Sequence, residues 1–137
     1  METFQVHILA ADKTFYEGPC VSITVPTTDG ERGILAHHSS MIAAIKPGTL
    51  RYQVPGEEPV LAAISPGMVK VENNDVLVLV DSAERPEEID VARAQREIDE
   101  AREILLQKKS IQDYHAAQAR MARALNRLRV KNMGIGR

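Results

Sequence analysis

The chain has 137 residues, of which 44% are hydrophobic and 26% are charged. This composition is that of a globular protein and excludes collagen-like and disordered chains, while the length excludes a large multidomain enzyme. With 17 Lys and Arg against 19 Asp and Glu, the net charge of −2 provides no whole-chain attraction to nucleic acid or to an acidic membrane. One cysteine cannot form an internal disulfide, which is typical of a reducing compartment. No segment approaches the roughly 20 apolar residues that span a bilayer, so we expect membrane contact only through a partner.

Short β-strands are expected in the first part of the chain. Val21, Ile23 and Val25 alternate with polar residues, which is the period of a strand with one buried face. The run 76–80 is apolar at every position, so we expect it to be buried on both faces, and the turn residues before it predict a hairpin. Frequent turn signals predict an antiparallel β-sandwich or barrel. Strands are expected near residues 4–8, 13–17, 21–25, 33–35, 49–54, 60–64, 69–72 and 76–80.

Glycine and proline divide the chain into two parts. All seven prolines and six of the eight glycines lie within residues 1–86, whereas residues 87–133 contain neither. Because proline removes a backbone donor and glycine adds backbone freedom, a stretch without either can form long helices, while the earlier part must turn often. The sequence therefore predicts a β domain over residues 1–85 and a helical domain over residues 86–137.

Two helices are expected in the second part. Pro86, followed by two glutamates, suits the first turn of a helix, because a proline there loses no needed donor. Ser110 and Asp113 form a capping pattern that can open a second helix. Apolar residues recur at steps of three and four in both segments, which predicts an antiparallel helical hairpin. The first seam is Val91, Ala94, Ile98, Ala101 and Leu105, and the second is Ile111, Tyr114, Gln118, Met121, Leu125 and Leu128.

The two expected helices differ in charge. Residues 87–103 carry seven acids and three bases, while residues 108–131 carry seven bases and one acid. If the helices pair, each exposed ion pair contributes a few tenths of a kcal/mol and is screened by salt. At 100° per residue, Arg120, Arg123 and Arg127 cluster about 160° from the centre of the second seam. We expect these arginines to be free to bind another group.

No catalytic constellation can be identified in the sequence. The adjacent His37 and His38 lack a third ligand at metal-site spacing and are interpreted as loop histidines. No basic residue adjoins Cys20, so we expect a packed thiol rather than a nucleophile. Phosphate-cradling loops and paired carboxylates in an apolar setting are not found either. The sequence therefore argues against intrinsic catalysis.

The segment 89–94 and the arginines of the second helix leave two interpretations open. The first is structural: Asp90 pairs with Arg93 three residues later, and the basic face is solvated. The second is an anion site, in which Arg123 and Arg127 offer bidentate donors to phosphate.

These features together resemble the epsilon subunit of bacterial F-type ATP synthase. The resemblance rests on the two-part architecture and on four sequence segments in a fixed order. They are Gly33-Ile34-Leu35 with His38 three residues on, Pro66-Gly67-Met68-Val69-Lys70-Val71, Ala83-Glu84, and Ile89-Asp90-Val91-Ala92-Arg93-Ala94.

The resemblance implies a ten-stranded β-sandwich that packs on the gamma subunit and touches the c-ring of a proton-translocating ATP synthase. Such a protein is a rotor component without catalytic activity, held peripherally at the cytoplasmic face of the bacterial plasma membrane. It implies no binding of nucleic acid and membrane contact only through the c-ring. The residues implied to contact the c-ring are Gly30, Glu31, Arg32 and His38.

The resemblance also implies a regulatory role for the hairpin. In the family the hairpin either folds against the sandwich or extends along gamma to the alpha and beta subunits, where it blocks ATP hydrolysis. No cofactor is required, but in some members ATP binds the folded hairpin as a regulatory ligand. Glu100 stands where nucleotide-binding members have arginine, and its carboxylate should weaken binding. The implied ATP-binding residues are Glu84, Ile89, Asp90, Arg93, Ala94, Arg123 and Arg127.

Two other classes of function compete with this interpretation. A nucleic-acid adaptor would use the basic second helix, but the chain is not basic overall and that helix offers only Tyr114 for base stacking. A small β-sandwich enzyme would need site chemistry that the sequence lacks.

Overall fold

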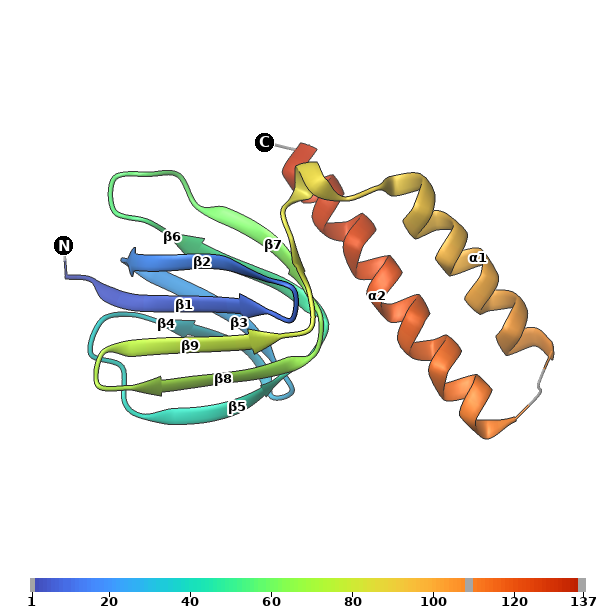
Figure 1. Ribbon diagram of the computed structural model, residues 1–137, viewed down its shortest axis with the longest axis horizontal. Coiled ribbons are helices and arrows are strands. Elements are labelled where there is room, and N and C mark those ends of the chain that lie inside the picture. The colour runs from blue at the N-terminus through green and yellow to red at the C-terminus, as the bar shows by residue number, and fades with distance from the viewer. Residues whose placement is uncertain (1, 108–109, 136–137) are drawn as a thin grey trace. The chain divides into compact units, whose positions relative to one another are not determined.

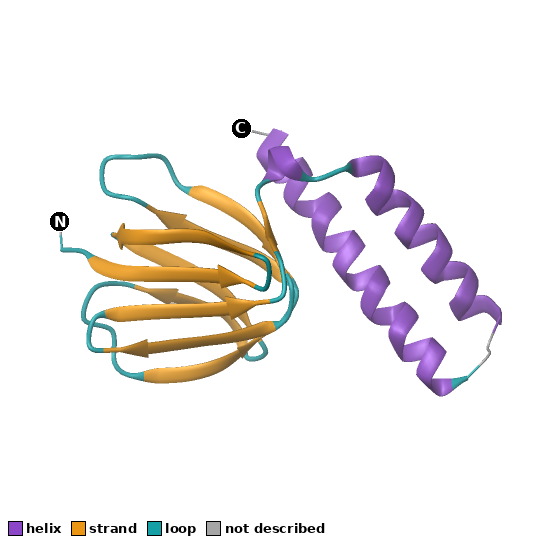
Figure 2. Ribbon diagram, viewed as in Figure 1, coloured by secondary structure: helices purple, strands orange, loops and turns teal. Residues whose placement is uncertain are grey.

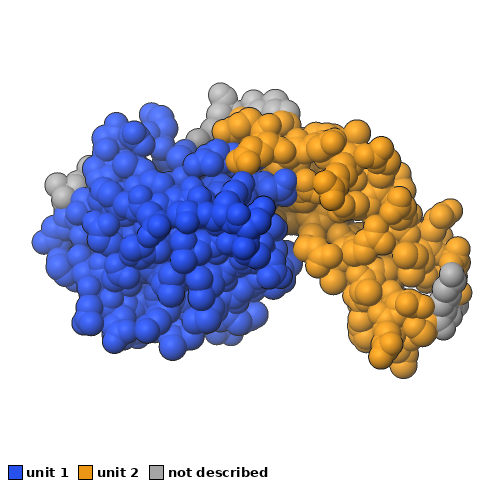
Figure 3. Space-filling view, viewed as in Figure 1, with its two compact units in different colours: residues 1–85 blue, residues 86–137 orange. Residues whose placement is uncertain are grey.

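The structure is a computed structural model that describes residues 2–107 and 110–135. The chain divides into two compact units, residues 1–85 and residues 86–137, which Figure 3 colours separately. The first unit holds ten strands, and the second holds a 3-10 turn and two α-helices (Figure 1). The expected fold class is therefore confirmed: an N-terminal β-sandwich is followed by a C-terminal helical hairpin (Figure 2).

Ten strands form the first unit, and all eight expected strands are among them. Two strands were not expected from the pattern of side chains, namely β5, which contains two alanines, and β10, which has only two residues. The strands are β1 (Phe4–Ala10), β2 (Lys13–Cys20), β3 (Ser22–Thr27), β4 (Gly30–Ile34), β5 (Met41–Ile45), β6 (Gly48–Gln53), β7 (Val60–Ile64), β8 (Gly67–Glu72), β9 (Asp75–Val80) and β10 (Ala83–Glu84).

The strands form one continuous sheet that folds over into two layers. One layer has the order β5-β8-β9-β1-β2 and the other β10-β7-β6-β3, with β4 paired to β3. The pairing of Thr27 with Ile45 connects the layers through β3 and β5. All neighbours are antiparallel except β1 and β9, which are parallel. Alternate side chains from both layers, such as Val6, Ile23 and Val78, are fully buried and form one hydrophobic core.

The helical unit begins with a short turn rather than a helix. Residues Pro86–Glu88 form a 3-10 turn (η1), and the first helix, α1, spans Val91–Gln107. The expectation that the helix starts at Pro86 is therefore wrong. Asp90 is the cap, because its Oδ1 accepts a hydrogen bond of 3.0 Å from the Arg93 backbone N–H.

The second helix, α2, spans Ile111–Ile135 and begins where the sequence predicted. Ser110 Oγ accepts a hydrogen bond of 3.0 Å from the Asp113 backbone N–H, which confirms the cap. The two helices run side by side in opposite directions, as Figure 1 shows.

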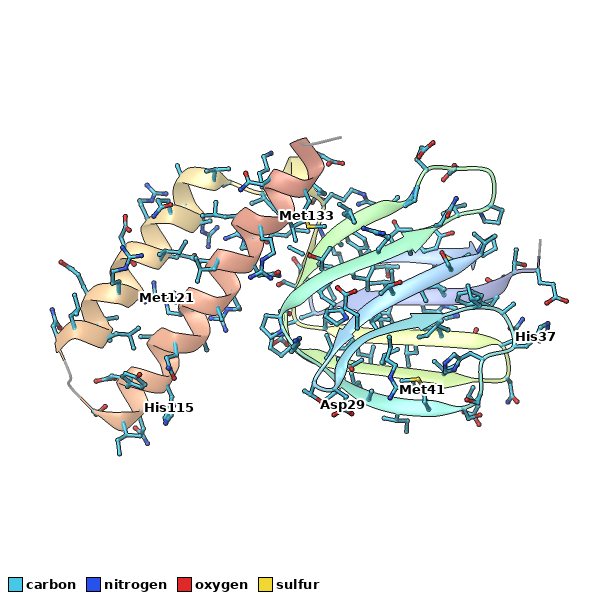
Figure 4. The ribbon with its side chains drawn as sticks, turned by 180° about the vertical axis from the view of Figure 1, so that it is seen from behind. Asp29, His37, Met41, His115, Met121 and Met133 are labelled. Carbon is cyan, nitrogen blue, oxygen red and sulfur yellow. The ribbon has the colours of Figure 1, made fainter. Side chains whose placement is uncertain are left out.

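The seam of α1 is confirmed at its centre, where Ala94, Ile98 and Ala101 are buried. The expected seam of α2 is wrong at Ile111, Tyr114 and Leu125, which are exposed, whereas its members Met121 and Leu128 are partly buried. The buried positions of α2 include Ala117 and Ala124, which the sequence pattern did not indicate because larger apolar residues lie nearby in the sequence. The seam combines Met121 and Leu128 with Ala117 and Ala124, also at steps of three and four, and Met121 is labelled in Figure 4. Alanines permit a close approach of the helices, and the acidic α1 attracts the basic side of α2.

Candidate functional site

An apolar surface lies on the outside of the first layer of the sandwich. Because strand residues alternate between faces, Leu77 and Leu79 of β9 point away from the core that buries Val78. The expectation that residues 76–80 are buried on both faces is therefore wrong, since Leu77 is half-buried and Leu79 is 37% exposed. We name the surface the outer apolar face; it consists of Leu9, Ile42, Ala44, Met68, Leu77 and Leu79.

The register of the strands makes this face continuous. Ala44 of β5 lies opposite Met68 of β8, which lies opposite Leu79 of β9. In the next row, Ile42 is 69% exposed and lies opposite Lys70. Exposed apolar side chains scattered singly are normal, but aligned rows of them mark an interaction surface.

A polar cluster centred on His7 adjoins the outer apolar face. His7 Nδ1 lies 2.6 Å from Glu17 Oε2 on β2, and His7 Nε2 lies 3.1 Å from Asp75 Oδ1 on β9. The hydrogen bond to Glu17 raises the pKa of His7 above its usual value of 6.5, assisted by Asp75 and opposed by desolvation. The imidazolium, which has two N–H donors, fits this arrangement of two carboxylates.

The residues implied to contact the c-ring do not form one cluster. Gly30 opens β4 with a φ of 113°, and its carbonyl accepts a hydrogen bond of 2.6 Å from Thr27 Oγ1. Glu31 and Arg32 follow it in β4 and are exposed. His38 comes after the other end of β4, where its ring Nδ1 lies 2.7 Å from the Ser39 carbonyl oxygen. Figure 4 labels Asp29 and His37 near these two separate loops.

The segment before α1 is tied to the end of α2. Ile89 is buried, and its backbone N–H donates to the Pro86 carbonyl at 3.2 Å. The same carbonyl accepts a hydrogen bond of 2.9 Å from Lys131 Nζ. A Cβ on Gly134 would lie 2.5 Å from Pro86 Cβ, so glycine there permits the close approach of η1 to α2.

Two arginines from different helices meet at one carboxylate. Arg93 Nε of α1 lies 3.5 Å from Glu97 Oε1, and Arg127 Nη1 of α2 lies 3.9 Å from Glu97 Oε2. The Arg127 side chain is 16% exposed and that of Glu97 28%, so the contact is partly shielded from water. Arg93 therefore pairs with Glu97, while the Asp90 carboxylate caps the helix through the Arg93 backbone.

The expectation of a free arginine face is wrong for two of its three members. Arg120 Nη2 lies 3.0 Å from Glu100 Oε2, and Arg127 lies near Glu97, so both arginines are directed toward α1. The cause is the rotation of the α2 seam onto its alanines. Arg123 is exposed.

The remaining implied ATP-binding residues lie in different surroundings. Ala94 is completely buried at the start of the α1 seam. Glu84 belongs to the sandwich unit, where it pairs with Ala63 between β10 and β7 and is half-buried. Within the helical unit, the structure thus brings Arg93 and Arg127 together and leaves Asp90 at the helix cap.

The described residues contain little chemistry that could support catalysis. In residues 2–107 and 110–135, no group of three or more His, Cys, Asp or Glu side chains could hold a metal ion. Burial raises the pKa of the Cys20 thiol to about 11, so it stays protonated and unreactive at neutral pH. Of the helices that the structure describes, none combines the length and apolar character required to cross a membrane.

A β-sandwich domain followed by a charged helical hairpin defines a class of two-domain proteins. Comparison with protein families places the chain within this class. Residues 3–86 match the β-sandwich domain of the ATP synthase delta/epsilon chain, and residues 87–132 match its long α-helix domain.

Individual relatives match over nearly the full length. The chain is 43% identical over 130 residues to the ATP synthase epsilon chain of Caldanaerobacter subterraneus, covering 94% of both chains. It is 35% identical over 132 residues to that of Ruminiclostridium cellulolyticum, covering 96% of this chain and 98% of the relative. The chain therefore belongs to the family of ATP synthase epsilon chains, which are non-catalytic subunits.

Solved structures share the fold at low sequence identity. A chain of the Euglena gracilis mitochondrial ATP synthase, solved as its OSCP, F1 and c-ring assembly, superposes with a TM-score of 0.78 at 24% identity. That match covers 88% of this chain and 76% of the other. A chain of the Tetrahymena thermophila mitochondrial ATP synthase central stalk and c-ring gives a TM-score of 0.65 at 15% identity, covering 95% and 97%.

Sequence reasoning missed two features of the site. The outer apolar face was missed because residues 76–80 were assigned to the interior; the exposed Lys70 opposite Leu77 is the signal that this side of the sheet faces outward. The role of Glu97 was also missed. Its spacing of four residues from Arg93 could have indicated the ion pair.

Proposed function

We propose that this chain is a rotor subunit of the central stalk in a proton-translocating F-type ATP synthase, where it couples the gamma subunit to the c-ring. The observation that carries this proposal is the outer apolar face on a member of the epsilon-chain family. A continuous apolar surface on a chain that does no chemistry is best explained by a permanent protein partner. The central stalk and c-ring assembly of the similar Tetrahymena chain supports the same partners.

The outer apolar face is the surface that we assign to gamma. Stable interfaces have an apolar core surrounded by polar residues, and here the apolar row that includes Met68 and Leu79 adjoins a row that contains Lys70 and His7. The exposed Glu31 and Arg32, with Gly30 and His38, are assigned to polar loops of the c-ring. This attachment holds the chain peripherally at the cytoplasmic face of the plasma membrane.

Substitution of the outer apolar face tests this assignment. Ile42→Glu puts a charge on the outer apolar face in place of an apolar side chain that is 69% exposed, and we expect at least a tenfold loss of affinity for the gamma-containing F1 complex. Arg51→Glu is the control, because Arg51 is exposed on β6 in the other layer. Equal binding of both variants and the unchanged chain would contradict the proposal.

We further propose that the hairpin inhibits ATP hydrolysis when it extends to the alpha and beta subunits. The opposite charges of α1 and α2 support this role, because a basic α2 released from α1 can pair with acidic segments elsewhere. The test compares ATP hydrolysis by complexes that contain the full chain or a chain truncated after Arg85. Hydrolysis should rise on truncation, and an unchanged rate would remove the inhibitory role while leaving the structural one.

ATP is the proposed ligand of the closed hairpin. The meeting of Arg93 and Arg127 from two helices supports this, since guanidinium groups bind phosphate with directed N–H donors. Arg123 is assigned to the phosphates as well. The nucleobase is assigned to the neighbourhood of Ile89, with Asp90 and Glu84 as hydrogen-bond acceptors, and Ala94 completes the proposed set of site residues. ATP would then stabilise the closed, non-inhibitory form by its preference for it.

Calorimetry of the chain with ATP tests the nucleotide site. Arg93→Ala and Arg127→Ala should each weaken binding by about tenfold or more. Arg129→Ala is the matched control, because Arg129 is exposed on α2 and is not assigned to the site. Absence of binding at millimolar ATP would exclude this ligand.

A further inference from the structure

Glu97 lies between the two arginines that the proposed function assigns to phosphate. Its Oε1 faces Arg93 Nε at 3.5 Å, and its Oε2 faces Arg127 Nη1 at 3.9 Å. One carboxylate of α1 thus contacts a guanidinium from each helix of the hairpin.

Carboxylate and phosphate compete for the same donors. Both are anions with planar or tetrahedral sets of oxygens that accept N–H bonds from guanidinium groups. An oxygen of Glu97 therefore stands near the position that a phosphate oxygen must take to reach both arginines. We propose that Glu97 is an internal competitor of the nucleotide and sets the affinity of this site. This inference rests on the proposed ATP site and concerns its regulation.

The contacts of Glu97 are weak enough to be exchanged for a ligand. The Arg93 side chain is 65% exposed, so water screens its pair with Glu97. Arginine also precedes glutamate by four residues here, which is the less favourable order for a pair on a helix. The contact with Arg127 is long. A triphosphate carries several negative charges and can displace the Glu97 carboxylate from the two arginines. The free energy needed to break these contacts lowers the affinity for the nucleotide.

Glu100 does not share this role, although its charge was expected to weaken nucleotide binding. Its Oε2 lies 3.0 Å from Arg120 Nη2, so its charge is already matched by an arginine that is not assigned to the phosphates. Removal of Glu100 would release Arg120 and break a 3.0 Å ion pair between α1 and α2. Glu97 is therefore the carboxylate whose removal should favour ATP.

The test measures ATP binding to the full chain by calorimetry, together with its helical content by circular dichroism. Glu97→Gln should bind ATP about five- to tenfold more tightly than the unchanged chain, since it removes one negative charge near the phosphates. Glu103→Gln is the matched control: it removes the same charge from an exposed position of α1 and should leave the affinity unchanged. If Glu97→Gln loses helical content, Glu97→Ala replaces it, because alanine favours the helix most and also lacks the carboxylate.

Three results would overturn the inference. Equal affinities of Glu97→Gln and the unchanged chain would reject competition by Glu97 and leave the ATP site standing. Weaker binding by a fully helical Glu97→Gln would show that Glu97 positions the arginines for the ligand. Absence of binding by every variant at millimolar ATP would reject the ATP site and the inference together.

Discussion

The His7 imidazole joins two strands of the sandwich through the 2.6 Å contact between its Nδ1 and Glu17 Oε2. Glu17 raises the pKa of His7 above 6.5, so the folded unit holds the His7 proton more tightly than the unfolded chain does. The stabilisation is fully present below about pH 6.5 and is lost as pH rises through the raised pKa. We expect the free energy of unfolding to fall by less than about 1 kcal/mol across this window, because the carboxylates are half-exposed.

Urea unfolding at several pH values between about 5.5 and 8.5 measures this effect. His7→Gln should remove the decrease, since it removes the titrating group and retains a polar side chain. His115→Gln is the control, because His115 is exposed on α2 outside the sandwich. Identical pH profiles of His7→Gln and the unchanged chain would contradict the prediction.

Gly67 allows β8 to approach β9 more closely than any other residue would permit. A Cβ at this position would lie 1.9 Å from the Leu79 carbonyl oxygen, and backbone atoms cannot move away without breaking the sheet. Gly67→Ala should therefore lower the free energy of unfolding by about 3 kcal/mol, measured by denaturant or heat. At Gly33 the nearest atom to such a Cβ is 4.0 Å away, so Gly33→Ala should be nearly neutral. Comparable stability of the two variants would show that β8 can shift.

Among the buried residues of α1, Ile98 has the largest apolar side chain. Ile98 is 2% exposed, whereas its neighbours in the α1 seam are alanines that bury little area. Ile98→Ala should cost about 3 kcal/mol and melt the helices before the sandwich. Thermal unfolding followed by circular dichroism measures this. Leu106→Ala is the control, with an effect within about 0.5 kcal/mol, because Leu106 is 73% exposed. Because alanine favours the helix in both variants, an equal loss of helix by Leu106→Ala would contradict a packing role that is specific to Ile98.

The fold class could be predicted from the sequence because its signals are local. Alternation of apolar residues identified strands such as β3, and the absence of glycine and proline identified the helices. The strand β5 was not expected, since Ala43 and Ala44 give no clear alternation between two faces. The strand β10 has two residues and exists only through its pairing with β7, which is a long-range contact.

The candidate site was less predictable because it depends on how two helices face each other. The sequence of α2 contains two seams at steps of three and four, and hydropathy favours the one with Ile111 and Leu125, which the structure exposes. Ala117 and Ala124 are buried because α1 approaches α2 closely there and because ion pairs form between the two helices. With Ala117 and Ala124 facing α1, the orientation of α2 about its own axis brings Arg127 close to Glu97.

Asp90 has a structural role that can be separated from its proposed role toward the ligand. Its Oδ1 accepts the Arg93 backbone N–H at 3.0 Å, so Asp90→Ala should cost about 1 kcal/mol and loosen the first turn of α1. Asp90→Asn keeps a capping oxygen and should leave the helix intact. Hydrogen exchange of the Arg93 amide measures both effects. Asp99→Ala is the control, because the Asp99 carboxylate accepts a hydrogen bond of 3.2 Å from the Gln95 side chain within α1. Protection of the Arg93 amide in Asp90→Ala would contradict the cap, whereas loss of ATP binding by a fully helical Asp90→Asn would show that the carboxylate charge itself serves the ligand.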